Sequence, residues 1–409
     1  MSRRRKRQRG FTLVELLMAA FLGFVVTMSI YLIFIGTTRQ YSVQEQVVTM
    51  HESMRFAVDF LKHELKGAGR LSVVNGRQAD GVGGGIGVRD PLLCPTRQNI
   101  QAFELFENDD RTPSILANAP NGLRPDRLRL LKDAPGASPL MVERIQGRTV
   151  KLGGHEEQLT SSTRALAQSQ PRMSRIFLPG HYLYILSRTG LSDLLPIADF
   201  NFSLAGSTID LTEQPCDMGS RSLVSQCLFG GCIAVPVELI EYRVELDGDS
   251  DTKTQLVRHT IDARQPTDDL GSQGLVLASQ IVDFQVMGTS DLRTRAQLEL
   301  VNSGQNIVPV ITPDGDPRDD RGNGPGDSEA EALNPRPESL RSVRVILAAR
   351  TAREDPQFQL AIDRTVPSES RQPTERTWFE LNPLEDTGYA RVTTLSFDVE
   401  TPNLYRGQP

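Results

Sequence analysis

An acidic side chain, Glu15, lies near the start of the apolar stretch FTLVELLMAAFLGFVVTMSIYLIFIG, which covers residues 11–36. A carboxylate at membrane depth costs about 2.5–3.5 kcal/mol, so it is expected to find a partner or to reach back to the headgroups. A helix of about 20 apolar residues crosses a bilayer, and this stretch is longer. The sequence therefore predicts a membrane-spanning helix that carries one carboxylate in need of a partner.

Basic residues gather in front of this stretch, where MSRRRKRQRG holds six of them. The whole chain has 45 basic and 51 acidic residues, so without these six the count is 39 against 51. Positive charge before a span marks the cytoplasmic side, which places the acidic body outside the cytoplasm. An acidic body also argues against nucleic acid as a partner, because phosphate binding needs a basic face. No small-residue cleavage pattern of a secretory signal follows the span.

The four cysteines of the chain all follow the span: Cys94, Cys216, Cys227 and Cys232. An even number in an oxidising compartment favours two disulfides over free thiols. The spacer LFGG suits a tight turn between Cys227 and Cys232, which leaves Cys94 to pair with Cys216 as one of three possible pairings. The spacing contains no C-x-x-C, so a zinc site is less favoured.

Other stretches with chemical potential are each incomplete. HELKG, from His63, lacks the second histidine of H-E-x-x-H, and GVGGGIG fails the spacing of a dinucleotide loop and follows a helix end. DGDSD, from Asp247, has the alternating carboxylates that begin a calcium loop. The glycine at the sixth position of such a loop and its distal glutamate are missing, so we interpret the string as a hairpin tip. No G-x-S-x-G elbow is present. We therefore expect no catalytic residue, no metal and no cofactor.

The string GFTLVELLMA after a short basic leader resembles the class III signal of type IV prepilins and pseudopilins. The resemblance implies cleavage after Gly10 by a prepilin peptidase and N-methylation of the new terminus, Phe11. It also implies that Glu15 pairs with the N-terminal amine of a neighbouring subunit as a filament grows. Unlike the usual major pilin, this chain has no proline in the segment, and its first proline is Pro91.

Beyond the span, the hydrophobic pattern continues as an amphipathic helix over residues 37–69. Period-two patterns then predict antiparallel strands in RLRLLK, VELIEYRVEL, TQLVRHT, IVDFQV, SVRVILAAR and TLSFDVE, each with one wet face. We predict an α+β fold with four parts: a cleaved leader (1–10), an assembly helix (11–36), a helix packed on the head (37–69) and a β-rich head (70–409). An acidic, Gly- and Pro-rich insertion at residues 312–337 is expected to be mobile.

The string HESMRFAVDFLKHELKGAG and the order of the later strands resemble minor pilins of the PilW type. This resemblance implies a pilin-like fold and a non-catalytic subunit that helps to initiate assembly of a type IV pilus. Its implied partners are the prepilin peptidase, other minor pilins, the major pilin and a tip adhesin. The subunit would span the inner membrane once with its head in the periplasm, and would lie in the extracellular pilus, at its tip, after assembly.

Two alternatives remain open from the sequence. A J-type minor pseudopilin of a type II secretion system shares the same signal and helix. A membrane-anchored exported enzyme or adhesin would use the span only as an anchor, and it would keep its leader.

Overall fold

The computed structural model describes residues 12–69, 102–106, 113, 116, 125–137, 139–153, 176–188, 192–201, 207–215, 222–228, 231–248, 252–264, 274–290, 340–352, 378–379 and 390–402. Two compact units divide the chain, Met1–Glu52 and Ser53–Pro409, and each is treated by itself. The Gly-rich run at residues 76–91 and the expected insertion at residues 312–337 lie outside the described residues.

Helix α1 covers Leu13–Gly67, 55 residues, and runs without a break through the two segments predicted to be helical, 11–36 and 37–69. At 1.5 Å per residue its length is about 82 Å. Polar side chains inside the apolar part bond to the helix's own backbone, since the hydroxyls of Thr27 and Ser29 each donate 2.8 Å bonds to the carbonyls of Gly23 and Val25. These bonds reduce the cost of placing a hydroxyl in an apolar medium.

In the second unit, the last turns of α1 bury one stripe of side chains, formed by Met54, Ala57, Leu61 and Leu65. The three- and four-residue spacing puts all four on the same helix face. The helix ends at Gly67, after which Gly69 takes a left-handed φ of 71° and its N–H donates to the carbonyl of Leu131 at 2.9 Å. The helix thus ends in a glycine-containing segment, and directly after it the chain contacts a strand.

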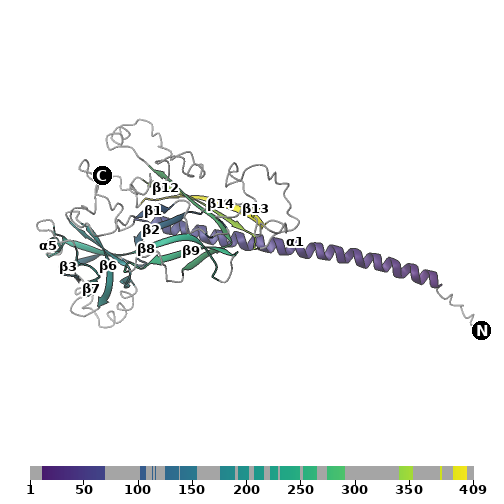
Figure 1. The fold of residues 1–409 in the computed structure, drawn as a ribbon, viewed down its shortest axis with the longest axis horizontal. Helices are drawn as coiled ribbons and strands as arrows, with labels where there is room; N and C mark the ends of the chain where they lie inside the picture. The colour runs from purple at the N-terminus through teal and green to yellow at the C-terminus, as the bar shows by residue number, and fades with distance from the viewer. Residues whose placement is uncertain are drawn as a thin grey trace, which may run out of the picture. The chain divides into compact units, whose positions relative to one another are not determined.

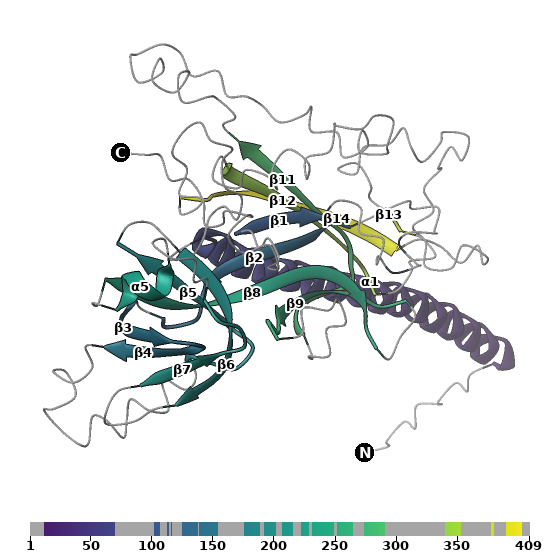
Figure 2. The same cartoon turned by 60° about the vertical axis from the view of Figure 1, so that its left-hand side comes forward.

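The first sheet has ten strands and is built around β8, the 15-residue strand Cys232–Leu246. The second half of β8 pairs antiparallel with β2 on one side and β9 on the other, and β1 and β10 extend the sheet beyond these two. Their bounds are Phe103–Phe106 for β1, Arg127–Asp133 for β2, Thr254–Ile261 for β9 and Leu275–Ser279 for β10. Figure 2 shows α1 running behind these strands.

The first half of β8 belongs to a closed ring of six strands, in the order β8–β3–β4–β7–β6–β5 and back to β8. The other bounds are Leu140–Gln146 for β3, Thr149–Gly153 for β4, Tyr182–Ser187 for β5, Ser192–Asn201 for β6 and Thr208–Leu211 for β7. Closure leaves none of these strands with an open edge. Buried Val142, Leu183, Leu195 and Ile209 fill the inside. The ring was not predicted from the sequence, and Figure 1 shows it at the end of β8 away from β9.

The second sheet has four antiparallel strands in the order β11–β12–β14–β13. Their bounds are Ile281–Ser290, Leu340–Arg350, Ala390–Glu400 and Trp378–Phe379. The chain passes from β10 in the first sheet to β11 in the second through Gln280, whose φ is 61°. A left-handed conformation at a residue other than glycine is uncommon, and here it is held by bonds from the Gln280 N–H to Thr254 O and from the Arg350 N–H to Gln280 O.

The expectation of one wet face on each strand is wrong for β2 and β8. Alternation is present, but the polar side is also covered, and the side chains of Arg127 and Glu241 are only 9% and 1% exposed. Leu128, Leu130 and Ile240 lie on the other side and are fully buried. The polar residues tolerate burial because they pair with one another, which a pattern of residue types cannot reveal.

A disulfide joins two of the four cysteines, Cys227 and Cys232, with sulfur atoms 2.00 Å apart. It ties the short helix α5, Leu223–Cys227, to the first residue of β8. Both residues are fully buried beside the ring's core. Cys94 and Cys216 lie outside the described residues, so their pairing remains a prediction.

Burial lowers the pKa of His181, although Glu238 nearby opposes that shift. A pKa below the ordinary value of about 6.5 means that the unfolded chain takes up a proton before the folded one does. The stability that depends on neutral His181 is therefore present above pH 6.5 or so, and it is lost as the pH falls through the folded pKa.

We expect His181→Phe to reduce the fall in melting temperature between pH 7.5 and pH 5, because Phe cannot be protonated. Melting followed by circular dichroism at both pH values measures this. His63→Asn is the control, since His63 is exposed. A fall as large in His181→Phe as in the control would contradict the prediction.

Candidate functional site

Glu15 forms a capping box with Thr12 at the start of α1. Its Oε2 accepts bonds from the Thr12 N–H at 2.9 Å and from the Thr12 hydroxyl at 3.0 Å. In return, the Thr12 Oγ1 accepts a bond from the Glu15 N–H at 3.3 Å. This reciprocal arrangement satisfies donors that a helix start otherwise leaves unpaired. The carboxylate is thus held at the helix start by its own chain.

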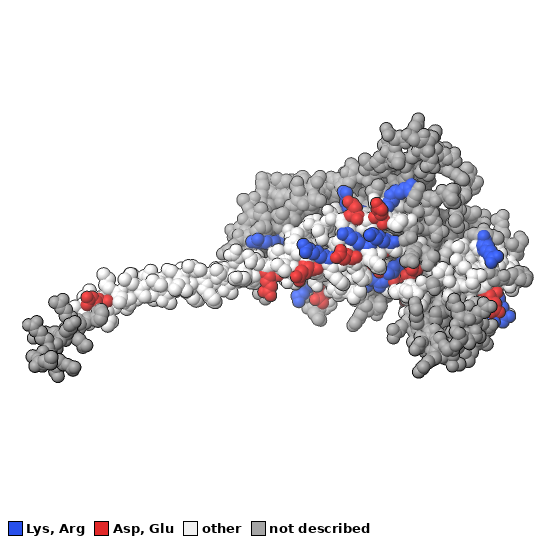
Figure 3. All heavy atoms as spheres, turned by 180° about the vertical axis from the view of Figure 1, so that it is seen from behind, with Lys and Arg blue, Asp and Glu red and all other residues white. Residues whose placement is uncertain are grey.

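The apolar part of α1 is exposed along its length within the first unit. Leu13, Phe21, Ile30 and Phe34 are between 62% and 78% exposed. By length and composition this helix is apolar enough to cross a membrane, and its most apolar stretch is not buried. Figure 3 shows it as uncharged surface, with acidic atoms only near its start. An uncovered apolar surface of this length calls for a membrane or for other apolar helices around it.

The other residues that the signal implies are only partly covered by the structure. Gly10 and Phe11 lie outside the described residues, so cleavage and N-methylation remain predictions. Sequence reasoning assigned Glu15 a partner in another subunit and missed its partner Thr12. The T-x-x-E spacing of a capping box was the signal that could have found it.

A second carboxylate of α1, Glu64, is buried against the first sheet. Its Oε1 lies 2.5 Å from Lys132 Nζ on β2, and its Oε2 accepts a 3.0 Å bond from the hydroxyl of Tyr242 on β8. Arg258 on β9 lies 3.5 Å from the same Oε2. Glu238 on β8 completes the group, 3.2 Å from Lys132 and 2.9 Å from Arg258. We call these five residues the helix-side network.

Two members of the helix-side network, Tyr242 and Arg258, have pKa values raised by their surroundings. Burial and the nearby Glu64 raise the pKa of Tyr242 well above its ordinary value, so its hydroxyl stays protonated and donates. Burial alone would lower the pKa of Arg258, but Glu238, Tyr242 and Glu64 raise it. Tyr242 and Arg258 therefore both keep their protons within the network.

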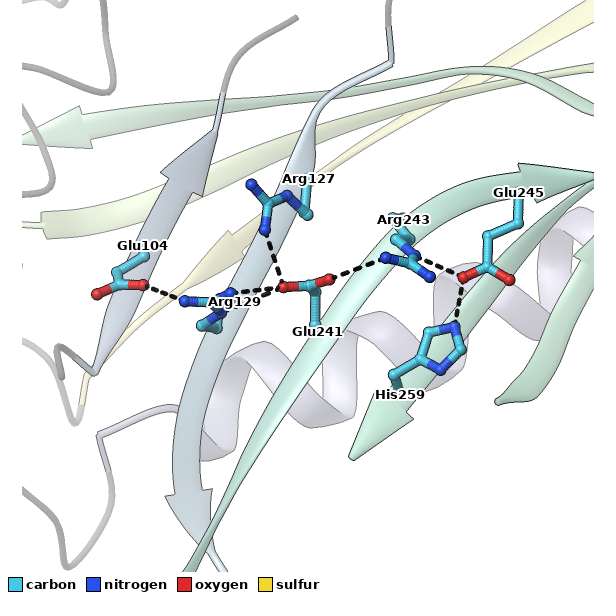
Figure 4. Close-up of polar contacts among 7 residues, drawn as sticks. All are labelled: Glu104, Arg127, Arg129, Glu241, Arg243, Glu245 and His259. Atoms are coloured by element: carbon cyan, nitrogen blue, oxygen red, sulfur yellow. Dashed lines mark hydrogen bonds and ion pairs between the residues drawn. The ribbon is translucent and has the colours of Figure 1, made fainter. Parts of the chain in front are cut away.

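A third polar group lies on the opposite face of the same strands and is drawn in Figure 4. Glu241 Oε2 binds Arg127 at 3.2 Å and Arg129 at 2.9 Å, and its Oε1 lies 3.7 Å from Arg243. Arg129 also binds Glu104 at 3.2 Å. The chain of contacts extends from Arg243 through Glu245 to His259, as the figure shows.

The charged side chains of these groups pair with one another. Glu241 is surrounded by guanidinium groups, and the pKa of Glu245 is lowered because His259 and Arg243 outweigh its burial. A general acid or base needs the opposite, a pKa moved towards neutrality. Among the described residues, no group of three or more His, Cys, Asp or Glu side chains is placed to hold a metal. On the face in Figure 3, blue and red side chains of the head alternate.

We expect Glu241→Ala to lower the free energy of unfolding by about 3–5 kcal/mol, because it removes a buried carboxylate that Arg127 and Arg129 share. Urea unfolding followed by circular dichroism measures this. The control is Glu143→Ala, which removes the exposed pair with Lys151 and should cost less than about 1 kcal/mol. Equal losses in the two variants would show that the buried group carries no special energy.

Residues 5–31 match the model of the prokaryotic N-terminal methylation motif. None of the curated proteins matches the chain. Among solved structures, a type IV-like pilin from Thermus thermophilus is similar at 14% identity, over 61% of this chain and 100% of that one, with a TM-score of 0.17. The matched residues include Gly10, Phe11 and Glu15, so the chain begins with a prepilin-like N-methylation signal.

Proposed function

We propose that this protein is a non-catalytic subunit of a pilin-type filament, which it enters through α1. One observation carries the proposal: the N-methylation motif at residues 5–31 runs without interruption into the apolar, exposed part of a 55-residue helix. A plain anchor has no need of Gly, Phe and Glu in these places after a basic leader. The antiparallel β-rich head agrees with the fold expected for such a subunit.

Glu15 would act as the assembly contact. Both bonds from Thr12 end on Oε2, which leaves Oε1 pointing to no donor of the capping box. The free amine of Phe11 in a neighbouring subunit is the group that would neutralise it in an apolar filament. Two charges that are costly apart become one neutral pair only when the subunits stack in register, so the pair serves specificity more than net stability.

Within this class, the resemblance to PilW-type proteins supports a minor pilin. Such a subunit would be cleaved by the prepilin peptidase, held in the inner membrane with its head in the periplasm, and then placed at the tip of an extracellular type IV pilus. There it would start assembly together with other minor pilins and the major pilin, and support adhesion and twitching motility. Heads of this size would crowd one another at every filament step, which supports a low copy number.

A J-type pseudopilin of a type II secretion system is the second candidate, because it would share the signal, the helix and Glu15. The genes that neighbour the gene for this protein, pilus genes or secretion genes, distinguish the minor pilin from the pseudopilin. A membrane-anchored enzyme or adhesin is the third candidate, and it predicts a mature chain that still begins at Met1.

The test of the proposed function is the mass of the mature N-terminus. We expect the chain from its native host to begin at N-methylated Phe11, since cleavage follows Gly10. Peptide mass spectrometry of the membrane fraction measures this, with a strain lacking the prepilin peptidase as the control. A mature chain that retains residues 1–10 would refute the proposal.

The role of Glu15 is tested by Glu15→Gln, which removes the charge while Gln still suits the third position of a capping box. We expect normal insertion and cleavage, but at least about tenfold less of this chain relative to the major pilin in sheared filaments, equivalent to ~1.4 kcal/mol. Quantitative mass spectrometry measures the ratio, and Thr12→Ser is the control because it keeps the cap. An unchanged ratio in Glu15→Gln would rule out the charge pair.

A further inference from the structure

We infer that the helix-side network locks the register of α1 on the first sheet, so that the helix cannot slide along the strands by one turn. The inference concerns the second unit only and does not depend on the proposed function. It begins from a property of the apolar contacts. Ala57, Leu61 and Leu65 repeat every four residues, so a slide of one turn, about 5.4 Å, can put Ala57 in the place of Leu61 and Leu61 in the place of Leu65.

The apolar pattern of the stripe by itself therefore does not exclude a neighbouring register. Backbone contacts tie the residues that follow the helix, because the Gly69 N–H donates to Leu131 O and Ala68 bridges Lys132. Within the helix, the contacts with the strands are made by side chains. A unique register needs a side chain that occurs once on the buried stripe.

Glu64 is that side chain. Among the described residues of α1, it is the only buried polar or charged one. Four residues before it stands Phe60, and four residues after it stands Ala68. A slide of one turn would therefore put an apolar group against Lys132 and Arg258, whose side chains are only 11% and 14% exposed.

The charges of the network balance only in the observed register. Two carboxylates meet two cations, and the Tyr242 hydroxyl fills the remaining position on Glu64. Without Glu64, Glu238 alone would face both cations. Removing one member of a buried ion group is strongly unfavourable, whereas replacing the entire group by apolar residues is often neutral. This asymmetry separates a register lock from a group that merely adds stability.

The test uses two cysteine reporters in the full-length chain in detergent. Ser53 Oγ lies 3.4 Å from the backbone N of Ser279 on β10, so Ser53→Cys with Ser279→Cys reports the observed register. Thr49→Cys with Ser279→Cys reports a helix displaced by one turn, because Thr49 would then take the place of Ser53. The ratio of the two cross-links, formed by mild oxidation and measured by mass spectrometry, sets the baseline with the network intact.

The deciding variant replaces the network by apolar residues: Glu64→Leu, Lys132→Met, Glu238→Leu, Tyr242→Phe and Arg258→Met. We expect it to fold with a melting temperature no lower than that of the parent, while the displaced cross-link rises at least about tenfold from the few per cent of a minor state. The matched control replaces the exposed pair Glu143 and Lys151 by Gln, which should leave the ratio unchanged. A folded apolar variant with the parent's ratio overturns the inference.

If the apolar variant does not fold, a swap with unchanged composition decides. Phe60→Glu with Glu64→Phe moves the carboxylate back by one turn. A register lock predicts that the helix follows it, so the displaced cross-link becomes the major product. A swap that keeps the observed register, or that fails to fold, overturns the inference.

Discussion

The burial of one carboxylate, Glu64, is the constraint on which the rest of the head depends. A buried ionised group is tolerated only with a partner, and the partners here come from three adjacent strands. Lys132 lies on β2, Tyr242 and Glu238 on β8, and Arg258 on β9. These strands must be in their observed register for the four side chains to meet one helix position. The helix and the centre of the first sheet are therefore mutually specified.

β8 transmits this constraint through the head because its two halves serve different structures. Its second half carries both polar groups, on opposite faces, while its first half closes the six-stranded ring. The disulfide at Cys232 holds the start of the same strand. Ion pairs and hydrogen bonds thus fix the face of the sheet that contacts α1. The ring is fixed by its closure, because none of its strands has an open edge that could pair with another strand. One strand joins a charged interface to an apolar core.

The two carboxylates of α1 show the same physics in two settings. Glu64 is neutralised by cations and a hydroxyl of its own chain, and it has a fixed place. Among the described residues, Glu15 is held by Thr12, through a capping box that satisfies hydrogen bonds without neutralising charge. A carboxylate next to an apolar surface that has no counter-charge among these residues favours a cationic partner. The contrast explains why one carboxylate is structural and the other is proposed to act in assembly.

The sequence by itself determined the local features. The span, the continuous helix, its stop near Gly69 and the antiparallel strands all follow from composition and periodicity, which depend on residues close together in the chain. The tight Cys227–Cys232 pair follows from spacing, and the signal at Gly10 and Phe11 from a short string. Tertiary structure alone decided which polar residues are buried. Glu64 looked like part of an incomplete H-E pattern, and Glu241 like the wet side of a strand. Their partners stand up to 194 residues away, as Arg258 does from Glu64, and no local pattern encodes a charge balance closed across four elements. The ring escaped prediction for the same reason, because closure depends on which strands pair and not on how each one alternates.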